Sequence, residues 1–144
     1  MSRDITVEVD LPYRRKDVWF ALTDPGALAE WLMPVDGFAP AVGTTFTLRA
    51  KPMPGWDGVV HCEVTEADEP TRLVYTWRGS RMRNTTTVTW ELTELGDGGT
   101  RLRLDHQGFA GLAGAALAFM HRGGWKKIVR ARLVDHLRRI EGMA

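Results

Sequence analysis

The sequence predicts an α+β fold in which a curved antiparallel sheet of about six strands wraps around a long C-terminal helix. Three observations support this prediction. Apolar and polar residues alternate near the N-terminus and again from Gly43 to Gln107, which is the period of strands with one buried face. The C-terminal third repeats its apolar residues near the helical period instead. Two short helical patterns follow the first strand.

The N-terminal elements follow from local signals. The first strand is expected from about Arg3 to Leu11, and Pro12 ends it because proline cannot donate to a ladder. A short helix is predicted behind the polar segment 14–17. Asp24 before Pro25 is typical of an N-cap with proline at the first helical position, so a second short helix begins there and ends before Pro34.

A hairpin is the clearest local pattern in the middle of the chain. Strands 84–95 and 100–107 are joined by Gly96–Gly99, a sequence that tolerates the positive φ angles of a tight loop. The predicted inner face of this hairpin carries Val88, Trp90, Leu92, Leu102, Leu104 and His106. The opposite face is polar, as an antiparallel sheet covered on one side requires.

The last helix is expected to present one apolar stripe to the sheet. The stripe comprises Trp125, Val129, Leu133, Leu137 and Ile140. The Gly123-Gly124 pair before it indicates a break or kink after a first helical segment at about 112–121.

Length and composition predict a single domain over residues 1–144, located in the cytoplasm. Lysine and arginine (19) nearly balance aspartate and glutamate (18), so no strong field favours nucleic acid. Cys62 is the single cysteine, which excludes an intramolecular disulfide and fits a reducing compartment. No apolar stretch typical of a signal peptide begins the chain. The apolar run 109–120 is too short to insert across a membrane.

A cavity is expected between the sheet and the C-terminal helix. A sheet that curls around one helix cannot be filled everywhere by side chains, and the two short helices would close one end of the groove. The position of the segment 51–57, which is rich in proline and glycine, suggests a loop over the mouth of this cavity.

Several motifs carry a resemblance to a known family across nearly the whole chain. They are Pro12, Asp17-Val18-Trp19, Ala21–Pro25, Trp31, Arg72–Trp77, Thr87–Leu92, Gly99–Leu102, His106–Phe109 and Gly124-Trp125. In this order the sequence resembles the START-like (SRPBCC) helix-grip superfamily, in the group similar to the C-terminal domain of activators of the Hsp90 ATPase. The resemblance implies the same architecture and a ligand cavity. It implies no fixed reaction, because members of one fold differ in function.

The candidate ligand-binding residues are apolar or aromatic side chains on the predicted inner faces, together with one histidine in phase with them. They are Trp31, Phe46, Leu48, Trp56, Val60, Tyr75, Trp77, Val88, Trp90, Leu104, His106, Trp125 and Val129. No catalytic residue is assigned. No cofactor or metal is expected, since the sequence lacks His-x-x-x-His and Cys-x-x-Cys spacings.

Four polar side chains leave more than one interpretation open. His106 and Tyr75 could form hydrogen bonds with a ligand. The alternative is that both are structural, His106 as a hydrogen-bonded core histidine and Tyr75 as a buried tyrosine. Asp57 and His61 suit an acid–base pair, but His61 is out of phase with its apolar neighbours, which favours a surface position. Arg78 at a strand end is a further possible pocket group whose role the sequence leaves open.

The predicted function is the binding of a small hydrophobic molecule, such as a lipid, polyketide or aromatic metabolite. One alternative is an enzyme of the cyclase, dehydratase or hydrolase type that uses the same cavity. A second is an Hsp90-type chaperone module or other protein-interaction module. The expected partner is therefore a small molecule rather than nucleic acid or a membrane, and the sequence leaves a homodimer open.

Overall fold

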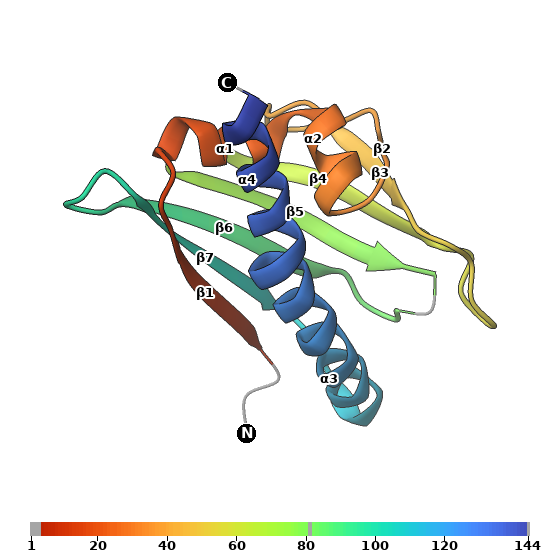
Figure 1. Cartoon of the computed structure of the whole chain (residues 1–144). Coiled ribbons are helices and arrows are strands. Elements are labelled where there is room, and N and C mark those ends of the chain that lie inside the picture. The colour runs from red at the N-terminus through yellow and green to blue at the C-terminus, as the bar shows by residue number, and fades with distance from the viewer. Residues whose placement is uncertain (1–3, 81, 144) are drawn as a thin grey trace.

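The computed structural model describes residues 4–80 and 82–143. Within them, seven strands form one antiparallel sheet in the order β1-β7-β6-β5-β4-β3-β2, and a long C-terminal helix crosses one face (Figure 1). Two short helices, α1 and α2, lie near the C-terminal end of that helix. The predicted α+β fold with a curved sheet, a long last helix and two short helices is confirmed, with one strand more than expected.

The bounds of the elements agree closely with the periodicity. The strands are β1 (Ile5–Leu11), β2 (Val35–Asp36), β3 (Thr45–Arg49), β4 (Val59–Asp68), β5 (Arg72–Gly79), β6 (Thr86–Glu94) and β7 (Thr100–Gln107). The helices are α1 (Arg15–Thr23), α2 (Pro25–Trp31), α3 (Gly111–Lys127) and α4 (Leu133–Met143), with a π-helical segment η1 (Ile128–Arg132) between the last two. The unpredicted strand β2 has two residues, too few for alternation to reveal. The predicted start of β1 at Arg3 lies outside the described residues.

The short helix α2 begins as its sequence predicts. The Asp24 carboxylate accepts a hydrogen bond from the Ala27 backbone N–H at 2.9 Å, and Pro25 occupies the first helical position. At the other end of the helix, the Trp31 indole N–H donates to the Ala21 carbonyl at 2.8 Å. This hydrogen bond links α2 to α1.

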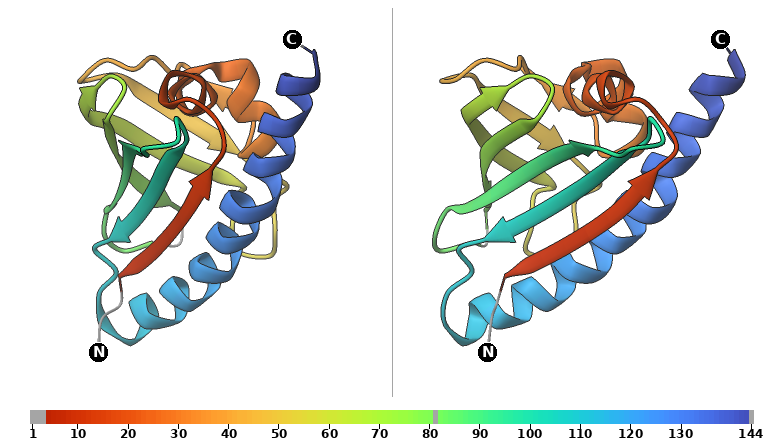
Figure 2. Two further views of the ribbon diagram at one scale, coloured as in Figure 1. Left: turned by 60° about the vertical axis from the view of Figure 1, so that its left-hand side comes forward. Right: turned by 90° about the vertical axis from the view of Figure 1, so that its left-hand side faces the viewer.

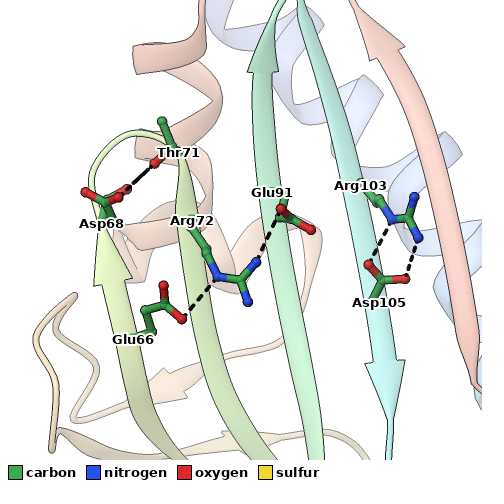
Figure 3. A network of polar contacts seen from close by, with 7 residues as sticks. All are labelled: Glu66, Asp68, Thr71, Arg72, Glu91, Arg103 and Asp105. Carbon is green, nitrogen blue, oxygen red and sulfur yellow. Dashed lines mark hydrogen bonds and ion pairs between the residues drawn. The ribbon is translucent and has the colours of Figure 1, made fainter.

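The sheet has one buried and one polar face. On the polar face, Arg72 contacts Glu66 at 3.1 Å and Glu91 at 3.2 Å, while Arg103 pairs with Asp105 at 2.9 Å (Figure 3). Exposed pairs of this kind stabilise a fold by about 1 kcal/mol or less each. These charged side chains favour a hydrated surface on this face of the sheet. The long helix packs on the opposite, apolar face.

Two features of the strands shape the sheet. The register between β4 and β5 shifts between Val64 and Glu66, which is a bulge that bends the strand and increases its twist. The predicted hairpin between β6 and β7 is confirmed, with Gly98 at a φ of 88° in its loop and a hydrogen bond from Leu95 N–H to the Gly99 carbonyl.

The C-terminal helix runs on through Gly123 and Gly124, so the predicted break there is wrong. The irregularity comes at η1 instead, where the Leu133 N–H bonds the Ile128 carbonyl five residues back. The wider π turn keeps residues that are spaced four apart on the side facing the sheet. Trp125, Val129, Leu133 and Leu137 are accordingly buried.

The last turn of α4 corrects one member of the predicted stripe. Ile140 is 42% exposed, because the helix end projects past the short helices (Figure 2). The preceding turn is held by the buried His136, whose Nδ1–H donates to the Glu30 carboxylate at 2.6 Å. This contact fixes α4 against α2.

We expect Asp24→Ala to lower the free energy of unfolding by about 1 kcal/mol, because the Ala27 N–H loses its cap. Chemical denaturation followed by circular dichroism measures this change. Asp17→Ala is the control, since Asp17 lies in the first turn of α1 and no hydrogen bond to its side chain is found among the described residues. Equal losses for both variants would mean that the cap does not stabilise α2.

Candidate functional site

A cavity of about 510 Å³ lies between α3 and the β4–β5 part of the sheet. The loop after β3, the Met33 position after α2 and the turn after β5 complete its wall. The lining residues are Met33, Met53, Pro54, Trp56, Val60, Trp77, Gly79, Met82, Leu117, Met120, His121, Gly124, Trp125 and Ile128. Hydrocarbon, thioether and aromatic groups dominate this wall, which is the usual surface of a site for a small apolar molecule.

Of the thirteen predicted site residues, Trp56, Val60, Trp77 and Trp125 line this cavity. The other nine pack in the core beside it. They are Trp31 in α2, Phe46 and Leu48 in β3, Tyr75 in β5, Val88 and Trp90 in β6, Leu104 and His106 in β7, and Val129 in η1. The alternation correctly indicates a buried face for them. Their contact with a ligand stays a prediction.

A chain of hydrogen bonds runs behind the cavity from helix to sheet. The Trp125 indole N–H donates to Nδ1 of His106 at 2.9 Å. Since Nδ1 accepts, the proton of the neutral ring is on Nε2, which donates to the Thr86 hydroxyl at 2.7 Å. That hydroxyl donates to the Trp77 carbonyl at 2.8 Å. Both ring nitrogens of His106 are therefore satisfied.

His106 is a neutral histidine with a structural role, since it links Trp125 of the helix to Thr86 of the sheet. Burial is the main cause that lowers its pKa to about 3, and the nearby His121 lowers it further. Protonation of His106 would also place a proton on Nδ1, where it would face the proton of the Trp125 N–H. The geometry thus agrees with a satisfied core histidine rather than a proton donor to a ligand.

His121 is the ionisable side chain that lies on the cavity wall among the described residues. Its Nδ1–H donates to the Leu117 carbonyl at 2.8 Å. The ring centroid lies 5.4 Å from that of His106 and 5.3 Å from that of Phe109. Burial lowers the pKa of His121, although its bond to Leu117 opposes this shift, and the ring is therefore stabilised in the neutral form.

The other polar candidates lie away from the cavity. The Tyr75 hydroxyl accepts a hydrogen bond from the Trp90 indole at 2.9 Å, and burial raises the pKa of this tyrosine. Asp57 is exposed and caps the Val59 N–H. Burial also raises the pKa of the Cys62 thiol to about 12, so it stays protonated at neutral pH.

His61 and Arg78 are paired neighbours on β4 and β5, and both are exposed. They line an open depression of about 670 Å³, together with Arg49, Glu63 and Thr76. This depression lies on the polar face of the sheet, opposite the helix. Its charged, solvated wall is a poor match for the hydrophobic ligand that the sequence predicts.

Ten lining residues were missed by the sequence analysis. They include four of the six methionines of the chain, Met33, Met53, Met82 and Met120. Three of these lie outside regular helices and strands, where the period of apolar residues gives no prediction of burial. Methionine is flexible and polarisable and adapts to irregular apolar surfaces, so its placement in loops was the available signal.

The described residues contain no cluster of three or more His, Cys, Asp or Glu side chains that could hold a metal ion. In the same part of the chain, every helix is too short or too polar to cross a membrane.

We expect the protein to lose stability as the pH falls from about 6.5 toward 3. The unfolded chain protonates His106 near its ordinary pKa of 6.5, whereas the folded protein resists protonation down to about pH 3. One proton taken up only by the unfolded state corresponds to a slope of about 1.4 kcal/mol per pH unit within this window. Urea denaturation at several pH values between 4.5 and 7.5 measures the slope.

His106→Gln removes the main titrating group and is expected to reduce this slope, and His121, whose pKa burial also lowers, accounts for the remainder. His61→Gln is the matched control, because His61 is exposed on the polar face. An unchanged slope in His106→Gln would show that His106 is not the group responsible.

Comparison with known proteins supports the architecture. Residues 12–138 match the family model described as Activator of Hsp90 ATPase homolog 1-like protein. A solved structure from Mesorhizobium loti is 31% identical, with a TM-score of 0.83 and coverage of 94% of this chain and 97% of that one. A solution structure from Bacillus halodurans is 26% identical, with a TM-score of 0.75, and covers 93% and 96%.

Two further structures are more distant. DynU16, a protein in the dynemicin biosynthetic locus, is 24% identical with a TM-score of 0.79, and the match covers 96% of this chain and 48% of that one. An Hsp90 activator from Plasmodium falciparum is 18% identical with a TM-score of 0.73 and 96% coverage of each chain. At these identities the likeness shows the fold alone. No curated protein matches the sequence.

Proposed function

Since the chain belongs to the Activator of Hsp90 ATPase homolog 1-like family and has the START-like helix-grip fold, we propose that its cavity binds one small hydrophobic molecule. Lipids, polyketides and aromatic metabolites are the candidate classes. The observation that carries the proposal is the wall of the 510 Å³ cavity, in which four methionines and three tryptophans surround a single imidazole. Burial of apolar ligand surface against such a wall supplies the binding free energy.

The enzymatic alternative has weaker support. Acid–base catalysis needs donor and acceptor groups within hydrogen-bond reach of the substrate. The four residues that the sequence suggested for this work, Asp57, His61, Tyr75 and His106, do not line the cavity. The neutral His121 has no carboxylate or second base beside it on the wall of described residues.

The chaperone alternative rests on the family description and on the Plasmodium falciparum Hsp90 activator. That structure is 18% identical, so its likeness speaks for the fold rather than for a shared partner.

The remaining predictions accompany this proposal. We propose that residues 1–144 form one domain, which is supported by a continuous hydrophobic core cluster that joins both helical regions to the sheet. We also propose a cytoplasmic location. The buried, unpaired Cys62 is compatible with a reducing compartment.

A change at Gly124 tests the cavity directly. Gly124 lines it, and beyond its chain neighbours and the backbone of its own helix, a Cβ atom at this position would meet no heavy atom within 4 Å. We expect Gly124→Leu to place its side chain in the cavity and to weaken binding of the neutral fluorescent probe N-phenyl-1-naphthylamine by about tenfold, the equivalent of about 1.4 kcal/mol. Fluorescence titration measures the dissociation constant.

Gly123→Leu is the matched control. Gly123 is also helical and free of contacts, but it does not line the cavity. Both variants gain the same helix propensity, so only a steric effect distinguishes them. If both variants bind the probe as well as the wild type, the cavity is not its binding site.

A further inference from the structure

The cavity wall holds few polar atoms that can reach a ligand. Two of its three indoles are engaged, since the Trp56 N–H donates to the Val59 carbonyl at 3.2 Å and the Trp125 N–H donates to His106. Among the described residues, no hydrogen bond of the Trp77 indole N–H or of the His121 Nε2 atom is found, and neither atom is fully buried. The wall therefore offers one donor and one acceptor on an otherwise apolar surface.

The orientation of His121 makes the identity of the acceptor definite. A backbone carbonyl can only accept, so the bond at 2.8 Å to Leu117 requires the proton on Nδ1. In the neutral ring Nε2 then carries the lone pair. The Trp77, His106 and Phe109 rings contact the imidazole edge-on or tilted, which restrains its rotation.

The two rings that carry this acceptor and this donor are neighbours on the cavity wall. The ring centroids of His121 and Trp77 are 6.2 Å apart, with an angle of 76° between the ring planes. One hydroxyl group can both donate and accept a hydrogen bond, so a single group in the cavity beside these rings could serve both of them.

We propose that the ligand of this cavity is a neutral apolar molecule with one hydroxyl group, a phenol or an alcohol, that donates to Nε2 of His121. The Trp77 indole N–H is available to the oxygen of the same hydroxyl. The inference rests on the proposed function, because it names the class of molecule that the apolar cavity selects.

The wall also discriminates against a carboxylate. None of the described lining residues is lysine, arginine, aspartate or glutamate. Burial of an anion without a charged partner is costly, whereas burial of a hydroxyl that forms hydrogen bonds is not. Burial lowers the pKa of His121, so this ring does not supply the missing positive charge at neutral pH. Fatty acids are therefore expected to bind less well than the corresponding alcohols.

Three probes of one shape test this preference. Biphenyl, 4-hydroxybiphenyl and biphenyl-4-carboxylate differ only in the group at one end. Competition against N-phenyl-1-naphthylamine at pH 7.5 gives the dissociation constant of each. We expect 4-hydroxybiphenyl to bind about 3- to 10-fold tighter than biphenyl, as one neutral hydrogen bond predicts. Biphenyl-4-carboxylate is expected to bind more weakly than either.

His121→Phe assigns the preference to the imidazole. The variant keeps a ring at this position but removes the acceptor, so biphenyl and 4-hydroxybiphenyl are expected to bind it equally well. His61→Phe is the control, since His61 is exposed on the opposite face of the sheet, and it should retain the wild-type preference. Circular dichroism verifies that both variants fold.

The outcomes separate this inference from the function on which it rests. If the wild type binds biphenyl at least as tightly as 4-hydroxybiphenyl, the hydroxyl inference is overturned while apolar binding stands, whether or not His121→Phe folds. A preference for the hydroxyl that persists in a folded His121→Phe variant also overturns the assignment to His121. If the wild type binds none of the three probes and does not bind N-phenyl-1-naphthylamine, the proposed function itself fails.

Discussion

The hydrogen bond from the Trp125 indole to His106 is the contact on which the rest of the structure depends. It joins the long helix to β7 of the sheet, between two residues that are 19 positions apart in the sequence. On one side of this bond the helix packs tightly on the sheet through Val129 and Leu133. On the other side the helix and β5 enclose the cavity. The same bond also determines the tautomer of His106 and so completes the connection to Thr86 and Trp77.

The cost of burying this polar chain is limited because every member is satisfied. An unpaired imidazole at full burial would destabilise the fold, whereas a neutral ring with one donor and one acceptor partner does not. Burial of this ring is the main cause of the low pKa of His106, and the nearby His121 lowers it further. The polar atoms of this chain are thus paired with one another behind the cavity. The cavity wall itself is apolar except at His121 and the Trp77 indole.

Local patterns were sufficient for most of the fold. Strand β7 has the predicted bounds, and Asp24 caps α2 as expected, because alternation and capping depend on neighbouring residues. Elements that depend on contacts with residues distant in the sequence were missed. Strand β2 exists through its pairing with β3, and the π-helical segment keeps Val129 and Leu133 against the sheet. The glycine pair at 123–124 suggested a break, but a helix covering a long sheet is held by packing rather than by local propensity.

The sequence by itself indicated most of the buried residues of the regular elements, because the period of apolar residues records one face of each element. Its motifs indicated the family to which the chain is similar. Whether a buried residue packs in the core or faces the cavity was decided by the tertiary structure. Trp77 and Trp90 lie on the same face of neighbouring strands, yet only Trp77 lines the cavity. The methionines and His121 reach the wall from loops and from the helix, where no strand period describes them. The physical reason is that a cavity forms where two surfaces diverge, and that divergence is a property of the whole sheet and helix rather than of any segment.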